Sequence, residues 1–264
     1  MNRKMIFFDI DGTLVPECTN DVPESAQNAI RQAMANGHLV FINSGRTFIN
    51  MHPNLKKLGF SGYCCGCGTE IYLGEEPLYS FELDQDSCLK ISTYFLEHNL
   101  TALFEGNNRL HYCGTPNENR DMSSFEESLG VTFHPVKTKE DLQDLSFTKM
   151  VYWKPSHMPE TEIEQFLSKW FDIIDRGNGM REAVPLNHSK ATAIEYLCKH
   201  FQIPLENCYA LGDSTNDLPM LKYVPHAIAM GVSMEEILPY VEYQTDTVEN
   251  DGIQKALQHY QIIL

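Results

Sequence analysis

The sequence predicts an α/β fold in which a parallel-sheet core is interrupted by an α+β insertion. Two short apolar segments rich in β-forming residues, 5–10 and 39–43, flank a segment with helical spacing, 23–36. Strand, helix and strand in this order predict a βαβ unit, because two parallel strands need a crossover connection. Near the C-terminus the alternation returns, with buried strands predicted at 208–211 and 226–230.

The middle of the chain has a different pattern. Helical spacing at 88–98 is followed by two β-rich segments, 101–105 and 109–113, with Asn107 and Asn108 between them as a hairpin turn. Neighbouring strands joined by hairpins predict an antiparallel sheet with helices on one face. We therefore divide the chain into a first core part, residues 1–82, an inserted α/β cap, residues 83–185, and a second core part, residues 186–264.

The composition is that of a soluble globular protein and limits its partners. Hydrophobic residues make up 42% of the chain, and the formal net charge is -16. Such a surface repels phosphate backbones and anionic lipid, so we expect neither nucleic acid nor a membrane as partner. The apolar run at the N-terminus is too short for a signal peptide, so a cytoplasmic location is expected. The sequence does not indicate an oligomeric state.

Eight cysteines raise the question of disulfides or a zinc site. Three of them lie in Cys64-Cys65-Gly66-Cys67, and the other five are scattered along the chain. There is no second CxxC pair to complete a tetrahedral site. We expect the cysteines to be reduced thiols that act as small hydrophobic residues in the core.

Polar residues follow the predicted strands, or open a helix, at four places. Ligands of an open parallel sheet bind outside the carboxyl ends of its strands. If the α/β segments form one sheet, these polar clusters meet at one edge. The clusters are Asp9 with Asp11, Ser44-Gly45-Arg46, Lys190, and the stretch from Asp213 to Asp217.

Three carboxylates at one point, those of Asp9, Asp11 and Asp213, repel one another unless a cation neutralises them. Their oxygens are the hard ligands that Mg²⁺ prefers, and Mg²⁺ binds through few carboxylates together with substrate phosphate. With Mg²⁺ and the ammonium group of Lys190, an acidic protein can hold a phosphate locally. The sequence therefore predicts magnesium as cofactor and a small phosphorylated metabolite as partner.

Asp9 and Asp11 can take separate roles in phosphate chemistry. Asp9 is placed to attack phosphorus, since carboxylates form aspartyl-phosphate intermediates. Asp11 can protonate the leaving oxygen and later take a proton from water. The hydroxyl group of Ser44, the amide of Gly45 and the side chain of Asn216 can donate hydrogen bonds to phosphoryl oxygens.

Simpler interpretations stay open for each residue taken alone. Asp11 could belong only to a turn and Ser44 only to a loop. Lys190 could be a solvated helix residue, and Asp213 could cap the helix that follows it. We expect Arg46 to orient its loop by pairing with a carboxylate and not to contact substrate.

Taken together, these motifs resemble those of the haloacid dehalogenase superfamily. Asp-Ile-Asp-Gly-Thr at residues 9–13 matches its first motif, and Asn-Ser-Gly-Arg at 43–46 is similar to its second. Lys190 corresponds to the third motif, and Gly-Asp-Ser-Thr-Asn-Asp at 212–217 resembles the fourth. All four occur in order, and the insertion is similar to the type IIB cap of the Cof-like phosphatases.

The resemblance implies a Rossmann-like core, a mobile α/β cap, and hydrolysis of small phosphorylated metabolites such as sugar phosphates. It implies that Asp9 is the nucleophile and Asp11 the acid and base. It implies a Mg²⁺ site formed by Asp9, the backbone carbonyl of Asp11, and Asp213, with Asp217 nearby. Phosphate contacts are implied for Ser44, Gly45, Lys190 and Asn216.

Three positions depart from the family pattern. Cys67 stands where Asn is usual, Ala191 follows the lysine where Gly is usual, and Val232 stands where Asn is common. None of them supplies one of the chemical groups named above. They bear on the subfamily and not on the reaction.

Two other functions compete with that of a phosphomonoester hydrolase. A phosphomutase on hexose phosphates would use the same aspartate pair and return the phosphoryl group to the sugar. A non-catalytic regulator would bind a sugar phosphate on the same scaffold. Loss of catalysis usually removes a nucleophile or a metal ligand, and Asp9, Asp11, Lys190 and Asp213 are all present.

Overall fold

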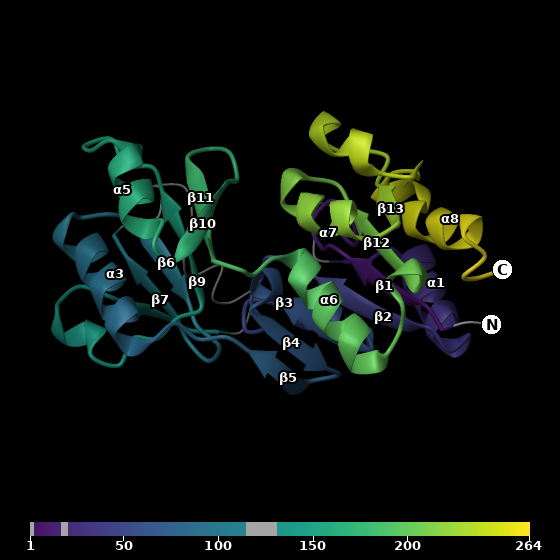
Figure 1. Ribbon diagram of the computed structural model, residues 1–264, viewed down its shortest axis with the longest axis horizontal. Coiled ribbons are helices and arrows are strands. Elements are labelled where there is room, and N and C mark those ends of the chain that lie inside the picture. The colour runs from purple at the N-terminus through teal and green to yellow at the C-terminus, as the bar shows by residue number, and fades with distance from the viewer. Residues whose placement is uncertain (1–2, 17–20, 115–130) are drawn as a thin grey trace. The chain divides into compact units, whose positions relative to one another are not determined.

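The computed structural model describes residues 3–16, 21–114 and 131–264, and these residues form two compact units (Figure 1). The core unit comprises Met1–Arg46, His52–Tyr79 and His188–Leu264. The insertion unit comprises Thr47–Met51 and Ser80–Asn187. The domain boundaries at 82/83 and 185/186 stay predictions, and nothing in the sequence pattern indicated that Thr47–Met51 would belong with the insertion.

The core unit is built on an eight-stranded sheet of order β14-β13-β12-β1-β2-β3-β4-β5. The strands from β14 to β3 are parallel, and β4 is antiparallel to β3, which confirms the predicted parallel sheet. Their bounds are β1 (Met5–Phe8), β2 (Leu39–Asn43), β3 (Gly62–Cys65), β4 (Glu70–Leu73), β5 (Glu76–Ser80), β12 (Cys208–Gly212), β13 (His226–Ala229) and β14 (Tyr243–Gln244).

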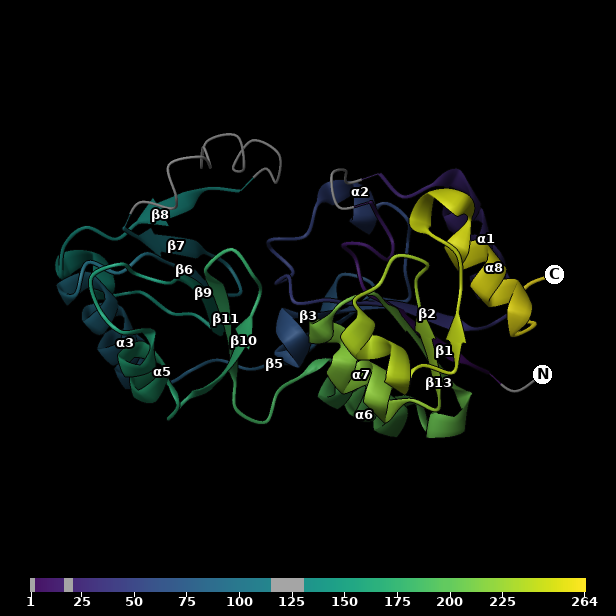
Figure 2. The same ribbon diagram turned by 90° about the horizontal axis from the view of Figure 1, so that it is seen from above.

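Helices cover both faces of the core sheet. In Figures 1 and 2, α6 (Lys190–Phe201) and α7 (Leu218–Tyr223) lie on one face, and α1 (Glu24–Ala35) and α8 (Gly252–His259) lie on the other. The short helix α2 (Pro53–Lys56) follows β2. Burial on both sides explains why the central strands are apolar at every position and do not alternate.

The insertion unit has its own six-stranded sheet of order β10-β11-β9-β6-β7-β8. Helices α3 (Gln85–Glu97) and α5 (Glu160–Leu167) cover one face of it, as Figure 2 shows, and bury Phe95 and Ile163 against Phe104 and Tyr152. The strands are β6 (Ala102–Glu105), β7 (Leu110–Cys113), β8 (Phe133–Pro135), β9 (Lys149–Trp153), β10 (Phe171–Asp175) and β11 (Met180–Pro185).

The predicted hairpin at Asn107 and Asn108 is confirmed. Strands β6 and β7 are antiparallel, and the N–H group of Gly106 donates to the carbonyl of Arg109 at 3.0 Å. The predicted antiparallel sheet is confirmed for the pairs β10–β11, β11–β9, β9–β6 and β6–β7, and the exception among the described strands is β8, which runs parallel to β7. Residues 114–132 separate these two strands, and a connection of that length can return the chain in the same direction, which a hairpin cannot.

The described residues contain neither a disulfide nor a helix that could span a membrane. The seven cysteines within the described ranges are free thiols, and all but Cys198 are buried; Cys18 lies outside those ranges. No helix in the described part of the chain is long and apolar enough to cross a bilayer.

Buried charges hold neighbouring strands of the insertion sheet together. Lys149 of β9 pairs with Glu182 of β11 and lies 3.6 Å from a carboxylate oxygen of Glu105 in β6. The hydroxyl group of Thr47 donates to the same glutamate at 3.2 Å. Removing one partner from such a group leaves an uncompensated charge out of water.

We predict that Lys149→Met lowers the free energy of unfolding by about 3–5 kcal/mol, because Glu105 would lose its buried cation and Glu182 would keep Arg176, 3.5 Å away, in place of two cations. Lys139→Met is the matched control, since Lys139 pairs with Glu97 at 2.5 Å but its side chain is 68% exposed. The control should cost far less, because solvent screens an exposed ion pair. Urea unfolding of both variants measures the difference, and equal losses would contradict the prediction.

Candidate active site

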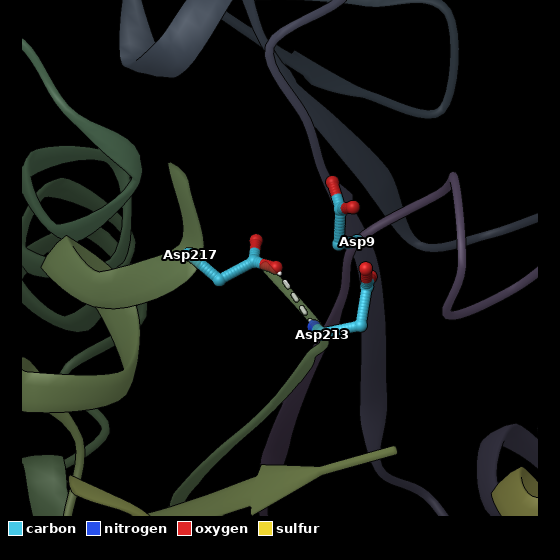
Figure 3. Close-up of side chains that lie close together, drawn as sticks. All are labelled: Asp9, Asp213 and Asp217. Carbon is cyan, nitrogen blue, oxygen red and sulfur yellow. Dashed lines mark hydrogen bonds between the residues drawn. The ribbon is translucent and has the colours of Figure 1, made fainter. Parts of the chain in front are cut away.

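Three aspartates meet at the carboxyl ends of β1 and β12 (Figure 3). Asp9 follows β1 and Asp213 follows β12, and the two strands pair in register, Phe8 opposite Leu211. Asp217 lies in the turn that comes next along the chain. Oxygens of all three carboxylates lie within 4.8 Å of one another, in an otherwise buried setting. We call this group the acidic cluster.

Lys190 joins two members of the acidic cluster. It is the first residue of α6, and its Nζ lies 2.5 Å from Asp9 Oδ1 and 2.5 Å from Asp217 Oδ1. The helix start that carries it is fixed by a capping box between Ser189 and Thr192. In addition, the Asn43 amide at the end of β2 donates to the backbone carbonyl of Lys190 at 2.9 Å.

The carboxylate of Asp217 is occupied on both oxygens. Oδ1 binds Lys190, and Oδ2 accepts the backbone N–H groups of Asp213 at 2.9 Å and Ser214 at 3.1 Å. A side chain on Gly212 would overlap it, because a Cβ there would lie 2.5 Å from Asp217 Cγ. Asp217 therefore fixes the position of the Asp213 loop as well as that of Lys190.

Burial and like charges shift the protonation of the acidic cluster. Burial, then the charge of Asp217, raises the pKa of Asp9 from 3.8 to about 7, against the opposing effect of Lys190. Burial, then the charges of Asp9 and Asp217, raises the pKa of Asp213 to about 8. Burial alone would lower the pKa of Lys190, but the charges of Asp217 and Asp9 outweigh it and raise that pKa. The single positive charge of Lys190 does not neutralise the negative charges of the three carboxylates in the acidic cluster.

The surroundings of Asp213 fit a divalent cation. The Thr13 hydroxyl donates to Asp213 Oδ1 at 2.9 Å and so orients the carboxylate. At Gly12, where φ is 78°, an added Cβ would lie 2.6 Å from Asp213 Cγ, so only glycine leaves room for this approach. Carboxylate oxygens are ligands of hard divalent cations, and the surplus negative charge favours one.

Asp11 lies apart from the acidic cluster and binds Arg46. The guanidinium group donates from Nη2 to Asp11 Oδ1 at 2.6 Å and from Nε to Oδ2 at 3.1 Å. The Asp11 side chain is 46% exposed, unlike the buried Asp9. The expectation that Arg46 pairs with a carboxylate is confirmed.

The loop after β2 is held by β3 and by the turn that follows it. The Ser44 N–H group donates to the Cys64 carbonyl at 2.9 Å, and the Ser44 carbonyl accepts the N–H group of Cys67 at 3.0 Å. Ser44 Oγ accepts the backbone N–H of Arg46 at 3.2 Å, with Gly45 between them. These bonds present Ser44 and Gly45 at the edge of the sheet that carries Asp9, since β1 and β2 are neighbours.

Asn216 is buried in the turn that carries Asp217. Its side-chain oxygen accepts a short hydrogen bond from the Ser214 hydroxyl. With the amide oxygen bound to Ser214, the NH₂ group of Asn216 is the donor end of the side chain.

The sequence motifs contained several positioning residues to which no role was assigned. Thr13, Gly12 and Gly212 lie inside the first and fourth motifs, yet their contacts reach Asp213 and Asp217. Asn43 lies in the second motif and holds the backbone of Lys190. Their polarity or small size was visible in the sequence, but their partners were not.

Comparison with known proteins places the chain in a family. A family model described as haloacid dehalogenase-like hydrolase matches residues 6–257. The chain belongs to this family. It is an enzyme, a hydrolase of phosphate esters with the Cof-like, subclass IIB architecture. Enzymes of this superfamily generally use a divalent metal ion, which agrees with the acidic cluster.

Relatives of this haloacid dehalogenase-like hydrolase carry the names of phosphatases. YkrA of Bacillus subtilis (strain 168), a protein named as a phosphatase, is 27% identical over 263 residues, which cover 98% of each chain. The HMP-PP phosphatase of Yersinia pseudotuberculosis is 25% identical over 271 residues, covering 97% of this chain and 95% of that one. A solved subclass IIB sugar phosphatase is 26% identical, with a TM-score of 0.84 over 98% of this chain and 100% of that one.

We predict that Gly212→Ala lowers kcat/KM about 100-fold, because the new Cβ would displace the Asp217 carboxylate and with it the Asp213 loop. Gly74→Ala is the control: φ there is 55°, and a Cβ would meet nothing within 4 Å. The control should lose about 1 kcal/mol of stability through backbone strain and keep its activity. Full activity of Gly212→Ala would contradict this account of Asp217.

We predict that the metal-free protein loses stability as the pH rises from about 4 to about 8. The folded state keeps protons on Asp9 and Asp213, with pKa values of about 7 and about 8, that the unfolded chain releases near 3.8. A divalent cation replaces these protons, so Mg²⁺ should raise the Tm more at pH 8.0 than at pH 5.5. Thermal melts with EDTA and with Mg²⁺ test this, and Asp213→Asn should lose most of the difference. A Mg²⁺ shift that is the same at both pH values would be evidence against it.

Proposed function

We propose that this enzyme is a Mg²⁺-dependent phosphomonoester hydrolase that acts on small phosphorylated metabolites through an aspartyl-phosphate intermediate. The observation that carries the proposal is the Asp9 carboxylate, which is buried and held by Lys190 next to Asp213. A fixed carboxylate beside a cation and a buried ammonium group is suited to attack an anionic phosphoryl group.

The phosphate would be held by the residues around Asp9. Lys190 supplies a positive charge at the start of α6, where the helix dipole is also favourable. The Ser44 hydroxyl, the Gly45 amide and the Asn216 NH₂ group supply hydrogen-bond donors. These local charges and donors offset the repulsion expected from a net charge of -16.

The metal ion would be held by Asp9, the backbone carbonyl of Asp11, and Asp213. Asp217, whose oxygens bind Lys190 and two backbone N–H groups, would orient the site from beside the ion. When bound, Mg²⁺ neutralises charge that develops on the phosphoryl oxygens and keeps the carboxylates ionised.

In the first step an Asp9 oxygen attacks phosphorus, forming the Asp9–phosphorus bond as the bond to the leaving oxygen breaks. Asp11 gives that oxygen a proton, so an alcohol leaves. In the second step Asp11 takes a proton from water, the water oxygen bonds to phosphorus, and the Asp9–phosphorus bond breaks. For the first step Asp11 must leave its ion pair with Arg46, because both of its oxygens are bound there.

The relatives narrow the choice of substrates to test. One is named for HMP-PP and a structural neighbour is a sugar phosphatase, so a panel should include HMP-PP, sugar phosphates and nucleotides. Release of inorganic phosphate separates a hydrolase from a phosphomutase, which would yield an isomeric hexose phosphate without release.

We predict that Asp9→Asn lowers kcat by at least about 10⁴-fold, because an amide is not a nucleophile toward phosphorus. Asp144→Asn, a change at an exposed insertion residue, should leave kcat unchanged. EDTA should abolish phosphate release and Mg²⁺ restore it. Substantial turnover by Asp9→Asn would rule out the covalent mechanism, and full activity in EDTA would rule out the metal requirement.

A further inference from the structure

Two cysteines away from the acidic cluster lie in sulfur contact. Cys198 is in the last turn and a half of α6, and Cys208 is the first residue of β12. Their Sγ atoms are 3.5 Å apart, and one thiol donates a hydrogen bond to the other. A disulfide bond is about 2.05 Å long, so a shift of about 1.5 Å would join them.

The other cysteines of the described residues lie in a different environment. Burial raises the pKa of Cys64, Cys65 and Cys88, and it raises the pKa of Cys113 to about 12. Thiols of this kind are inert, because the thiolate is the reactive form. Cys198 is the one thiol among the described cysteines that is not buried, and its hydrogen bond with Cys208 lowers its pKa. The same bond, together with burial, raises the pKa of Cys208.

We propose that Cys198 and Cys208 form a redox modification site, which a small neutral hydroperoxide converts into an intrachain disulfide. Cys198 is the residue oxidised first, because it is the partly exposed thiol. Cys208 is the resolving residue, because it is buried directly against the Cys198 sulfur.

The steps balance with one peroxide for each disulfide. The Cys198 thiolate attacks a peroxide oxygen, the O–O bond breaks, and hydroxide leaves and takes the proton that Cys198 gave up, forming water. Cys198 is then a sulfenic acid. The Cys208 sulfur attacks the Cys198 sulfur, the S–O bond breaks, and the oxygen leaves as a second water with the Cys208 proton. Two thiols are oxidised and one hydrogen peroxide is reduced.

The charges around Cys198 favour a neutral oxidant. The carboxylates of Glu195 and Glu206 act on Cys198 and oppose its ionisation. Lys199 pairs with Glu195 at 2.5 Å and offsets its charge, so repulsion of glutathione disulfide, an anion, comes from Glu206 and from the net charge of -16. Hydrogen peroxide carries no charge and is small enough to reach a half-buried thiol.

The site is separate from the proposed catalytic residues. Cys198 lies two helical turns after Lys190, and Cys208 lies at the opposite end of β12 from Asp213. A shift of about 1.5 Å at these ends leaves the acidic cluster in place, so we expect the disulfide form to keep its phosphatase activity. A cross-link between α6 and β12 should also raise the Tm.

The experiment treats the full-length Cys18→Ser protein with hydrogen peroxide, followed by alkylation of the remaining thiols and mass spectrometry. The Cys18 change removes a thiol outside the described residues. The expected product is lighter by two hydrogens, and dithiothreitol reverses it. Trypsin separates the two cysteines at Lys199, so the disulfide links peptides 191–199 and 200–222.

Two further variants decide between the disulfide and simple oxidation. In Cys208→Ser the resolving thiol is missing, so Cys198 should gain one or two oxygens and no cross-link should form. Cys113→Ser removes a buried thiol and should behave as the parent. The proposal is overturned if the parent protein accumulates sulfinic acid at Cys198 without a cross-link. It is also overturned if peroxide links a different pair, or if Cys208→Ser and the parent give the same products.

Discussion

The active site depends on one buried ion pair system, in which the Lys190 ammonium group lies between Asp9 and Asp217. Each of these charges would be strongly unfavourable out of water, and each is tolerated because the others are present. The three residues come from the start of α6, the position directly after β1 and the turn after β12. The folded chain must therefore bring three segments into register before any of these charges can be buried.

The position of Lys190 in turn rests on the loops that follow β2 and β3. Asn43 holds the backbone carbonyl of Lys190, and a Cβ on Gly68 would lie 2.4 Å from the carbonyl oxygen of Ser189. Cys67, next to that glycine, has a φ of 56°, a region in which asparagine is more common than cysteine. Cys67 therefore adopts a left-handed backbone conformation in the loop that packs against the start of α6.

Buried charged residues have different roles in the two units. In the core unit the acidic cluster carries more negative than positive charge, which raises the pKa of Asp9 and Asp213 and favours a cation. In the insertion unit Lys149 lies among the carboxylates of Glu105 and Glu182 and serves to join strands. Burial alone does not mark a functional charge; what distinguishes the core site is uncompensated charge at the carboxyl ends of parallel strands.

The sequence by itself determined the parallel sheet and the edge at which Asp9, Ser44, Lys190 and Asp213 would meet. Apolar strands and helical spacing are local properties, and parallel strands bring their carboxyl ends together whatever the loops do. Only the tertiary structure decided which atoms pair: that Asp217 binds Lys190 and the Asp213 loop, and that Asp11 binds Arg46. It also decided the contact of Cys198 with Cys208 and the parallel course of β8. Such pairings depend on side-chain direction and loop path, and the periodicity of a sequence carries neither.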